Sequence, residues 1–353
     1  MPRALVVGGT GLIGRATARR LLAAGWEVDL TGRNPAHLPA DIAAAGAKFV
    51  VADRDDPAQL LAALGDGADL LVDCICFTAD HATGLLPLVR DASSTVMISS
   101  KGVYVDGAGH HSNSSVAPHF DGPIRETQAT VAPTGAADYM TREGYAANKV
   151  AAEQVLLDSG RPVTVLRPSK IHGAGALQPR EWIFVKRVLD CRPAVFLAHR
   201  GAGVDHPTAA ANLAALIEVV ATKPGQRILN SADPDAPSAL EISRTIARQL
   251  DHVWDEVLLD DDGADETLGR HPWDVPHPVV LDMNAAINLG YSPVGDYATT
   301  VVDEVNWLVS AARGGAGAGL LPGPDDAFFA PFFAYAAEDR YLSTRPAEPS
   351  TAG

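Results

Sequence analysis

The chain has 353 residues, 47% of them apolar and 20% charged, a composition typical of a globular protein with a sizeable core. The formal net charge is −15, which disfavours nucleic acids and anionic membranes as partners. Three cysteines without metal-ligand spacing suit a reducing cytosol, so we expect a cytoplasmic protein. No apolar run approaches the ~20 residues of a membrane helix, and we expect no signal peptide.

Short β-rich apolar runs alternate with longer amphipathic stretches in the first half of the chain. Strands are predicted at Ala4–Val7, Glu27–Thr31, Lys48–Val51, Leu70–Cys76, Thr95–Ser99 and Val163–Leu166. Helices are predicted at Gly14–Ala24, Ala58–Leu64 and Tyr145–Asp158. This alternation predicts right-handed βαβ units and a doubly wound, parallel α/β sheet.

The second half of the chain is less regular, with helices predicted at Pro207–Thr222, Ser238–His252 and Thr299–Ala312. Residues 311–324 are rich in Gly, Ala and Pro, which predicts a flexible linker. The aromatic run at 328–335 is too apolar to stay in water, so we expect it to dock on its own subunit or a neighbour. A polar tail follows from Pro346.

A glycine-rich turn, Gly-Gly-Thr-Gly-Leu-Ile-Gly at residues 8–14, joins the first predicted strand to the first predicted helix. Glycines there permit a tight turn, close approach of a pyrophosphate to the backbone and tight packing of the helix on the strand. The helix N-terminus adds free amide groups and the positive end of its dipole. This pattern predicts a Rossmann-type dinucleotide site formed by Gly8, Thr10, Gly11, Leu12, Ile13 and Gly14.

The end of the second predicted strand bears on the choice of cofactor. A site for NAD usually has an acidic residue about 20 residues after the glycines, which binds the ribose 2′-hydroxyl. Gly32 and Arg33 occupy this neighbourhood, and Arg15 is a second candidate cation. We therefore predict NADP(H) as the preferred cofactor and NAD(H) as the alternative, unless Arg33 is only a solvated strand-end residue. Asp53 either binds the adenine amino group or caps its own loop.

Three further residues predict hydride chemistry. Tyr145 and Lys149 lie at i and i+4 of a predicted helix, on one face, and a nearby cation lets a tyrosine exchange protons near neutral pH. Ser100 follows the fifth predicted strand, at the edge where an open α/β sheet binds ligands. A Tyr and a Lys at this spacing are usually a surface pair, but the glycine loop and Ser100 favour a catalytic set.

Four motifs together resemble an extended short-chain dehydrogenase/reductase of the NAD-dependent epimerase/dehydratase family. They are GGTGLIG at 8–14, ISSKGVY at 98–104, YAANK at 145–149 and VLRP at 165–168, and the resemblance covers roughly residues 3–310. It implies that Ser100 polarises the substrate oxygen, that Tyr145 is the acid/base, and that Lys149 assists Tyr145 and binds the nicotinamide ribose. It also implies that Pro168 begins a loop against the nicotinamide, with Ser169 lining the same cleft.

The chain departs from the family pattern at several positions, including those that distinguish dehydratases from other members of the family. Dehydratases of the family place an acidic pair directly after the catalytic Ser or Thr, whereas Lys101 and Gly102 stand here, so dehydration is not expected. Lys101 either contacts a substrate anion or polarised oxygen, or extends into solvent. Residues 74–77 read Cys-Ile-Cys-Phe instead of His-Leu-Ala-Ala, and Asn212 replaces a usual Asp. We find no arginine set for a nucleotide-sugar diphosphate.

These observations predict three regions. The first is an NAD(P)-binding Rossmann domain at 1–167, and the second is a smaller, mixed α/β domain at 168–312 that mainly binds substrate, with some segments returning to the Rossmann core. The third, at 313–353, comprises a linker, an aromatic docking segment and a tail. The leading prediction is NADP(H)-dependent reduction of a ketone, or oxidation of a secondary alcohol, in a polar small metabolite. One alternative is an NAD(P)-dependent epimerase of a sugar or nucleotide sugar. Another is a catalytically silent dinucleotide-binding or RNA-binding relative. We predict a small-molecule substrate and a homodimer, with no metal, nucleic acid or membrane as a partner.

Overall fold

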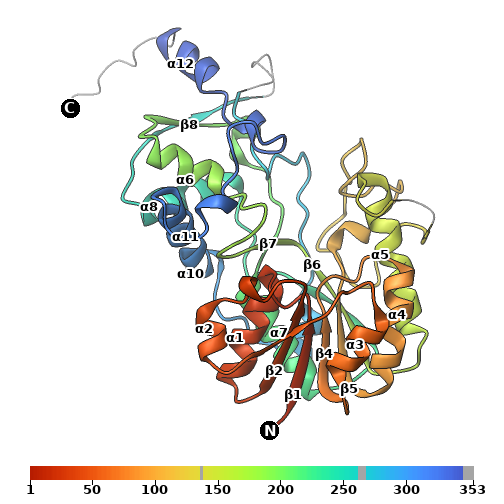
Figure 1. Cartoon of the computed structure of the whole chain (residues 1–353). Helices are drawn as coiled ribbons and strands as arrows, with labels where there is room; N and C mark the ends of the chain where they lie inside the picture. The colour runs from red at the N-terminus through yellow and green to blue at the C-terminus, as the bar shows by residue number, and fades with distance from the viewer. Residues whose placement is uncertain (136–137, 261–267, 345–353) are drawn as a thin grey trace. The chain divides into compact units, whose positions relative to one another are not determined.

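The computed structural model describes residues 1–135, 138–260 and 268–344, and its largest element is a seven-stranded parallel sheet (Figure 1). The strand order is β10-β6-β5-β4-β1-β2-β3, and every neighbouring pair is parallel. The sheet contains β1 (Arg3–Val7), β2 (Glu27–Gly32), β3 (Lys48–Val51), β4 (Ala68–Asp73), β5 (Ala92–Ile98), β6 (Val163–Pro168) and β10 (Arg227–Ser231). The strand order reverses between β1 and β4, where open α/β sheets form a ligand crevice at the carboxyl ends of their strands.

Helices cover both faces of this sheet, as Figure 1 shows. One face packs against α1 (Leu12–Ala23), α2 (Ala40–Ala44), α7 (Ala210–Thr222) and α9 (Asn284–Asn288). The other face packs against α3 (Pro57–Leu64), α4 (Ala79–Arg90) and α5 (Arg142–Leu157). Side chains alternate along β1, so that Ala4 and Val6 join the first core whereas Leu5 and Val7 join the second. The predicted doubly wound α/β fold is confirmed.

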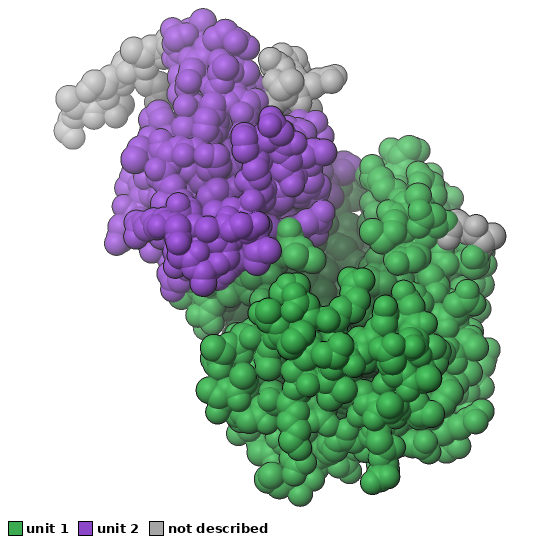
Figure 2. All heavy atoms as spheres, in the orientation of Figure 1, with its two compact units in different colours: residues 1–177, 205–236, 277–303 green, residues 178–204, 237–276, 304–353 purple. Residues whose placement is uncertain are grey.

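The chain divides into two units, each discontinuous in sequence (Figure 2). Unit 1 comprises residues 1–177, 205–236 and 277–303, and unit 2 comprises 178–204, 237–276 and 304–353. Unit 1 also holds a two-stranded sheet of β7 (Lys170–His172) and β9 (Pro207–Ala209), and the short helices η1 (Pro35–His37), η2 (Lys101–Val103) and α10 (Tyr297–Thr300). The assignment of residues 168–312 mainly to substrate binding stays a prediction.

Unit 2 is built around a parallel pair of strands, β8 (Ala194–Leu197) and β11 (Asp255–Leu258). Its apolar core includes Phe196, Val257 and Leu268. Its other elements among the described residues are α6 (Trp182–Leu189), η3 (Ala198–Gly201), α8 (Ala239–Gln249), η4 (Ala318–Leu320), η5 (Ala330–Phe332) and α12 (Tyr335–Thr344), with α11 (Val302–Ala312) crossing from unit 1.

The aromatic segment after the linker packs against other residues of unit 2. The buried carboxylate of Glu338 pairs with Nη2 of Arg187 at 2.6 Å and with Nη2 of Arg192 at 3.1 Å. The guanidinium of Arg192 also lies 4.4 Å from the ring centroid of Tyr335, and Phe329 is buried. These contacts involve residues up to 344, and the role of this stretch as a docking segment stays a prediction. The polar tail predicted from 346 lies outside the described residues.

Two predicted elements have different bounds in the structure. The strand predicted to run to Cys76 ends at Asp73, whose carboxylate accepts a hydrogen bond from the backbone N–H of Ile75 at 2.9 Å and turns the chain. The helix predicted from Pro207 begins at Ala210, because residues 207–209 pair with β7 as β9. The hydrophobic pattern alone does not distinguish a strand that leads straight into a helix from one continuous helix.

Two helical segments also differ from the sequence prediction. α4 was not predicted, since Gly84 and Pro87 interrupt its pattern, yet Thr78 caps it by accepting from the backbone N–H of His81. The helix predicted at 299–312 is two helices, α10 and α11. Within residues 1–135, 138–260 and 268–344, no helix combines the length and apolar character needed to cross a membrane.

Candidate active site

The loop between β1 and α1 has no space for a side chain at Gly9 or Gly14. Gly8 has φ +77°, a conformation that residues with a Cβ rarely adopt. A Cβ on Gly14 would lie 2.6 Å from the carbonyl oxygen of Gly8, and a Cβ on Gly9 would lie 2.7 Å from Cβ of Leu30. α1 begins directly after this loop, so its positive end lies beside bare backbone. This cradle fits a dinucleotide pyrophosphate.

The carboxyl end of β2 offers a cation instead of a carboxylate. A Cβ on Gly32 would lie 3.1 Å from Cζ of Phe49, so an acidic side chain there would have to displace that ring. Arg33 follows on the surface and forms no ion pair with any residue that the structure describes. Its guanidinium is therefore accessible to an added phosphate group.

Arg15 and Asp53 both bind the protein's own backbone. Nη2 of Arg15 donates to the carbonyl oxygens of Gly175 at 2.9 Å and Ala174 at 3.3 Å, and burial lowers the pKa of Arg15. The carboxylate of Asp53 accepts from the backbone N–H of Asp55 at 3.1 Å. Arg15 thus ties α1 to a loop of unit 1, and Asp53 caps its own turn. Cofactor contacts by these two residues stay predictions.

Ser100 and Tyr145 converge on Gly102. Ser100 follows β5, and its Oγ accepts a hydrogen bond from the backbone N–H of Gly102 at 3.0 Å. Tyr145 lies in the first part of α5, which Thr141 caps by accepting from Gly144. A Cβ on Gly102 would lie 3.3 Å from Oγ of Ser100 and 4.0 Å from Cε1 of Tyr145. The structure therefore brings these two predicted residues together.

Lys149 lies one turn further along α5 and is 2% exposed. Its Nζ donates to the carbonyl oxygens of Cys76 and Ile98, both at 2.8 Å, just beyond β4 and at the end of β5. Nζ also lies 6.0 Å from the ring centroid of Tyr145. The ammonium is therefore anchored at the carboxyl edge of the sheet, on the same side as the tyrosine.

Lys101 is buried in an ion pair with Asp205, and the same carboxylate pairs with Lys170 in β7 at 3.1 Å. Asp205 therefore connects the turn after Ser100 to the segment after β6. The expectation that Lys101 extends into solvent is wrong, because Asp205 holds it inside the protein. Its contact with a substrate stays a prediction.

The segment after β6 follows the strand ends closely. Pro168 closes β6, and the backbone N–H of Ser169 donates to Oγ1 of Thr208 at 3.0 Å and to the carbonyl oxygen of Ser231 at 3.1 Å. Oγ of Ser169 is buried without a hydrogen-bond partner among the residues described. The predicted roles of Pro168 and Ser169 in binding nicotinamide and substrate stay predictions.

The cysteines near this edge are not activated. Burial raises the pKa of the Cys76 thiol to about 12 and raises that of Cys74 further above its ordinary value. A thiol with a raised pKa is a poor nucleophile. Both side chains therefore serve packing, as their positions after β4 suggest.

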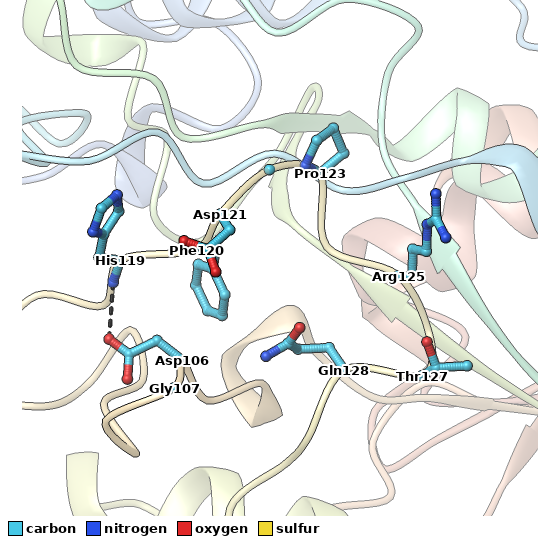
Figure 3. A pocket seen from close by; sticks show the side chains of 10 residues that line it. Asp106, Gly107, His119, Phe120, Asp121, Pro123, Arg125, Thr127 and Gln128 are labelled. Atoms are coloured by element: carbon cyan, nitrogen blue, oxygen red, sulfur yellow. Dashed lines mark hydrogen bonds between the residues drawn. The ribbon is translucent and has the colours of Figure 1, made fainter.

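A polar hollow of about 420 Å³ lies along the loop between η2 and α5 (Figure 3). Asp106 at its rim accepts from the backbone N–H groups of His119 at 2.9 Å, His110 at 2.8 Å and Ala108 at 2.9 Å. These hydrogen bonds lower the pKa of Asp106 to about 2. The carboxylate is therefore engaged in holding the loop, and we assign no ligand to this hollow.

The family model described as "NAD dependent epimerase/dehydratase family" matches residues 4–192, which include the glycine loop, Ser100, Tyr145 and Lys149. The chain belongs to this family. The predicted family resemblance is confirmed. A comparison of this family member with curated protein sequences gives no match.

Solved structures show the same fold over most of this family member. It is similar to a UDP-glucose-4-epimerase from Stenotrophomonas maltophila with bound NAD (TM-score 0.68, 19% identity, 89% of this chain and 100% of that chain). It is also similar to dTDP-glucose 4,6-dehydratase from Bacillus anthracis in complex with NAD (0.66, 16%, 91% and 100%) and to a putative epimerase from Burkholderia cenocepacia (0.64, 23%, 87% and 98%). These likenesses confirm the extended short-chain dehydrogenase/reductase fold.

In this epimerase/dehydratase family member, two residues that the sequence analysis did not predict contact predicted site residues. Asp205 pairs with Lys101, and the ring of Phe77 lies 4.2 Å from Nζ of Lys149. The sequence held a signal for Phe77, because 74–77 departs from the small residues usual in the family. It held none for Asp205, which lies far from Lys101 along the chain.

Proposed function

We propose that this protein is an NADP(H)-dependent oxidoreductase that acts on a ketone or secondary alcohol of a polar small metabolite. The observation that supports this most is the convergence of Ser100 and Tyr145 on Gly102, with the anchored Lys149 behind them. Bound nicotinamide would supply the hydride or accept it. The chain itself would supply binding, orientation and the proton.

Each member of the set has a separate role in this proposal. Oγ of Ser100 accepts from Gly102, so its O–H points elsewhere and can donate to the substrate oxygen. The hydroxyl of Tyr145 gives a proton to that oxygen during reduction and takes it back during oxidation. The positive charge of Lys149 stabilises the phenolate that Tyr145 becomes.

The preference for NADP(H) rests on the end of β2. The contact of Gly32 with Phe49 leaves little space for an acid, and the exposed Arg33 supplies a guanidinium for a 2′-phosphate. Solved proteins with this fold bind NAD, so NAD(H) is the alternative cofactor.

An epimerase is the second candidate, because the family and two similar solved proteins are described by that activity. It would use the same Ser100, Tyr145 and Lys149, with the cofactor restored within one turnover. A dehydratase is not proposed, since Lys101 and Gly102 stand where such enzymes carry acids. A silent binding protein is disfavoured by the intact catalytic set.

Stoichiometry separates these candidates. The full-length protein would first be examined by mass spectrometry for a co-purified small molecule, which identifies the substrate class. Incubation of that molecule and its oxidised form with NADPH then tests the reaction. Loss of one NADPH per product supports the oxidoreductase. Conversion to an epimer without net loss of NADPH establishes the epimerase. If the protein converts neither molecule, both candidates are contradicted.

The predicted homodimer is tested by light scattering of the full-length protein.

A further inference from the structure

The ring of Phe77, shortly after the end of β4, covers the ammonium of Lys149. Nζ of Lys149 lies 4.2 Å from the ring centroid of Phe77, compared with 6.0 Å from that of Tyr145. A lysine within about 6 Å of an aromatic centroid is attracted by the negative face of the ring. Phe77 is therefore the nearer aromatic partner of Lys149.

Two neighbours hold this ring in place. The backbone N–H of Phe77 donates to Nδ1 of His81 at 3.1 Å, which fixes the chain at the start of α4. The ring of Tyr139 stacks on the ring of Phe77, with centroids 5.3 Å apart and an interplanar angle of 16°. Phe77 is also half-buried.

Lys149 needs such a neighbour because no carboxylate among the described residues pairs with its charge. Its side chain is 2% exposed. Two of its three N–H groups donate to the carbonyl oxygens of Cys76 and Ile98. A buried ammonium is costly unless its remaining surface meets a favourable group. The face of Phe77 is the group present there.

We propose that Phe77 is a positioning residue that holds the ammonium of Lys149 against its two carbonyl partners and excludes water from it. Its ring and the two carbonyl oxygens confine Nζ from three sides. The lysine is thereby kept beside Tyr145, where its charge is required. This inference rests on the proposed function for the catalytic role of Lys149, but not for the position of Nζ.

If Phe77 had a purely space-filling role, its variants would behave differently. If Phe77 only fills volume, leucine would replace it well, because leucine is also apolar and bulky. If the aromatic face is what holds Lys149, tyrosine would replace Phe77 and leucine would not. Phe77→Leu and Phe77→Tyr therefore form a matched pair.

Acetylation of lysines in the full-length protein measures the confinement directly. The protein is treated with N-hydroxysuccinimidyl acetate, and the rate at Lys149 is followed by peptide mass spectrometry, with the exposed Lys48 as internal reference. We expect slow acetylation of Lys149 in the natural protein and in Phe77→Tyr, and about tenfold faster acetylation in Phe77→Leu. Unchanged acetylation of Lys149 in Phe77→Leu would overturn the proposal. Circular dichroism confirms that each variant is folded.

Binding of NADPH provides a second readout without a substrate. We expect Phe77→Leu to weaken NADPH binding several-fold, Phe77→Tyr to retain it, and Phe77→Leu to add nothing in a Lys149→Met background. Equal losses from Phe77→Leu in both backgrounds would show that Phe77 does not act through Lys149. Full turnover by Lys149→Met would contradict the proposed function alone, because the acetylation result still reports where Phe77 holds Nζ.

Discussion

Arg167 in β6 and Glu153 in α5 form a buried ion pair, with Nε of Arg167 3.0 Å from Oε1 of Glu153 and side-chain exposures of 4% and 2%. The hydroxyl of Ser99 also donates to Glu153. Glu153 lies one turn after Lys149, so the pair fastens α5 to the sheet directly beneath the candidate catalytic residues. The position of Tyr145 and Lys149 therefore depends on a contact outside the site itself.

Glu153→Gln is expected to destabilise the protein strongly. It leaves the buried guanidinium of Arg167 without a counter-charge, and breaking such a pair costs about 3–5 kcal/mol. Urea unfolding measures the loss. Asp41→Asn breaks the exposed pair with Arg19 and serves as the control, with an expected loss of about 0–1 kcal/mol. Similar losses in both variants would contradict a structural role for Glu153.

Asp205→Asn is expected to lower the free energy of unfolding more than Lys101→Met does. The first change removes the carboxylate that two ammonium groups share, whereas the second leaves Asp205 paired with Lys170. Thermal and urea unfolding of both variants test the order.

In the same Lys101→Met protein, a raised KM with unchanged NADPH affinity would support the predicted substrate contact. An unchanged KM and kcat would exclude it.

Arg33→Ala is expected to weaken NADPH binding by about 1.5–3 kcal/mol, because a charge-assisted hydrogen bond to the 2′-phosphate is lost. NADH binding should not change, since NADH lacks that phosphate. Fluorescence titration with both cofactors measures the difference. Arg90→Ala removes an exposed arginine at the end of α4 and is the control. Equal affinity of the natural protein for NADH and NADPH would contradict the predicted preference.

Tyr145→Phe is expected to reduce turnover ~10²–10⁴-fold, the range typical of general acid–base catalysis, while NADPH binding stays nearly intact. Only the hydroxyl that exchanges the proton is removed. Tyr139→Phe removes a hydroxyl from the neighbouring aromatic stack and should keep most of the activity. Steady-state kinetics with the identified substrate test both. Retention of most activity by Tyr145→Phe would assign the proton transfer to another group.

Acid unfolding is expected to reveal the contribution of Asp106. Its pKa is lowered from 3.8 to about 2, so the ionised carboxylate stabilises the folded state above the unfolded pKa. That stabilisation is lost as the pH falls through the lowered value. The difference in free energy of unfolding between the natural protein and Asp106→Asn should be constant above about pH 5 and shrink towards pH 2. A difference independent of pH over this range would contradict the assigned cause.

Much of unit 1 could be predicted from the sequence because its signals are local. Gly8 is required by its positive φ, and Gly14 by its contact with the backbone of Gly8 and Gly9, so these two glycines mark a turn through contacts within the loop itself. The strands before residue 100 appear as short apolar runs, since both faces of the parallel sheet are covered. Tyr145 and Lys149 lie one helical turn apart, a relationship that follows from helix geometry alone.

Only the tertiary structure decided what surrounds these residues. Lys101 meets Asp205, and Lys149 meets Phe77, across segments that are far apart along the chain. β10 joins the same sheet as β6 although the long segment between them contributes to both units. Such contacts follow from which surfaces bury each other when the chain folds, and hydrophobic periodicity does not record the partner of a given side chain. The residues of the candidate catalytic set can therefore be predicted from the sequence, whereas the charged groups and aromatic rings that hold them in position cannot.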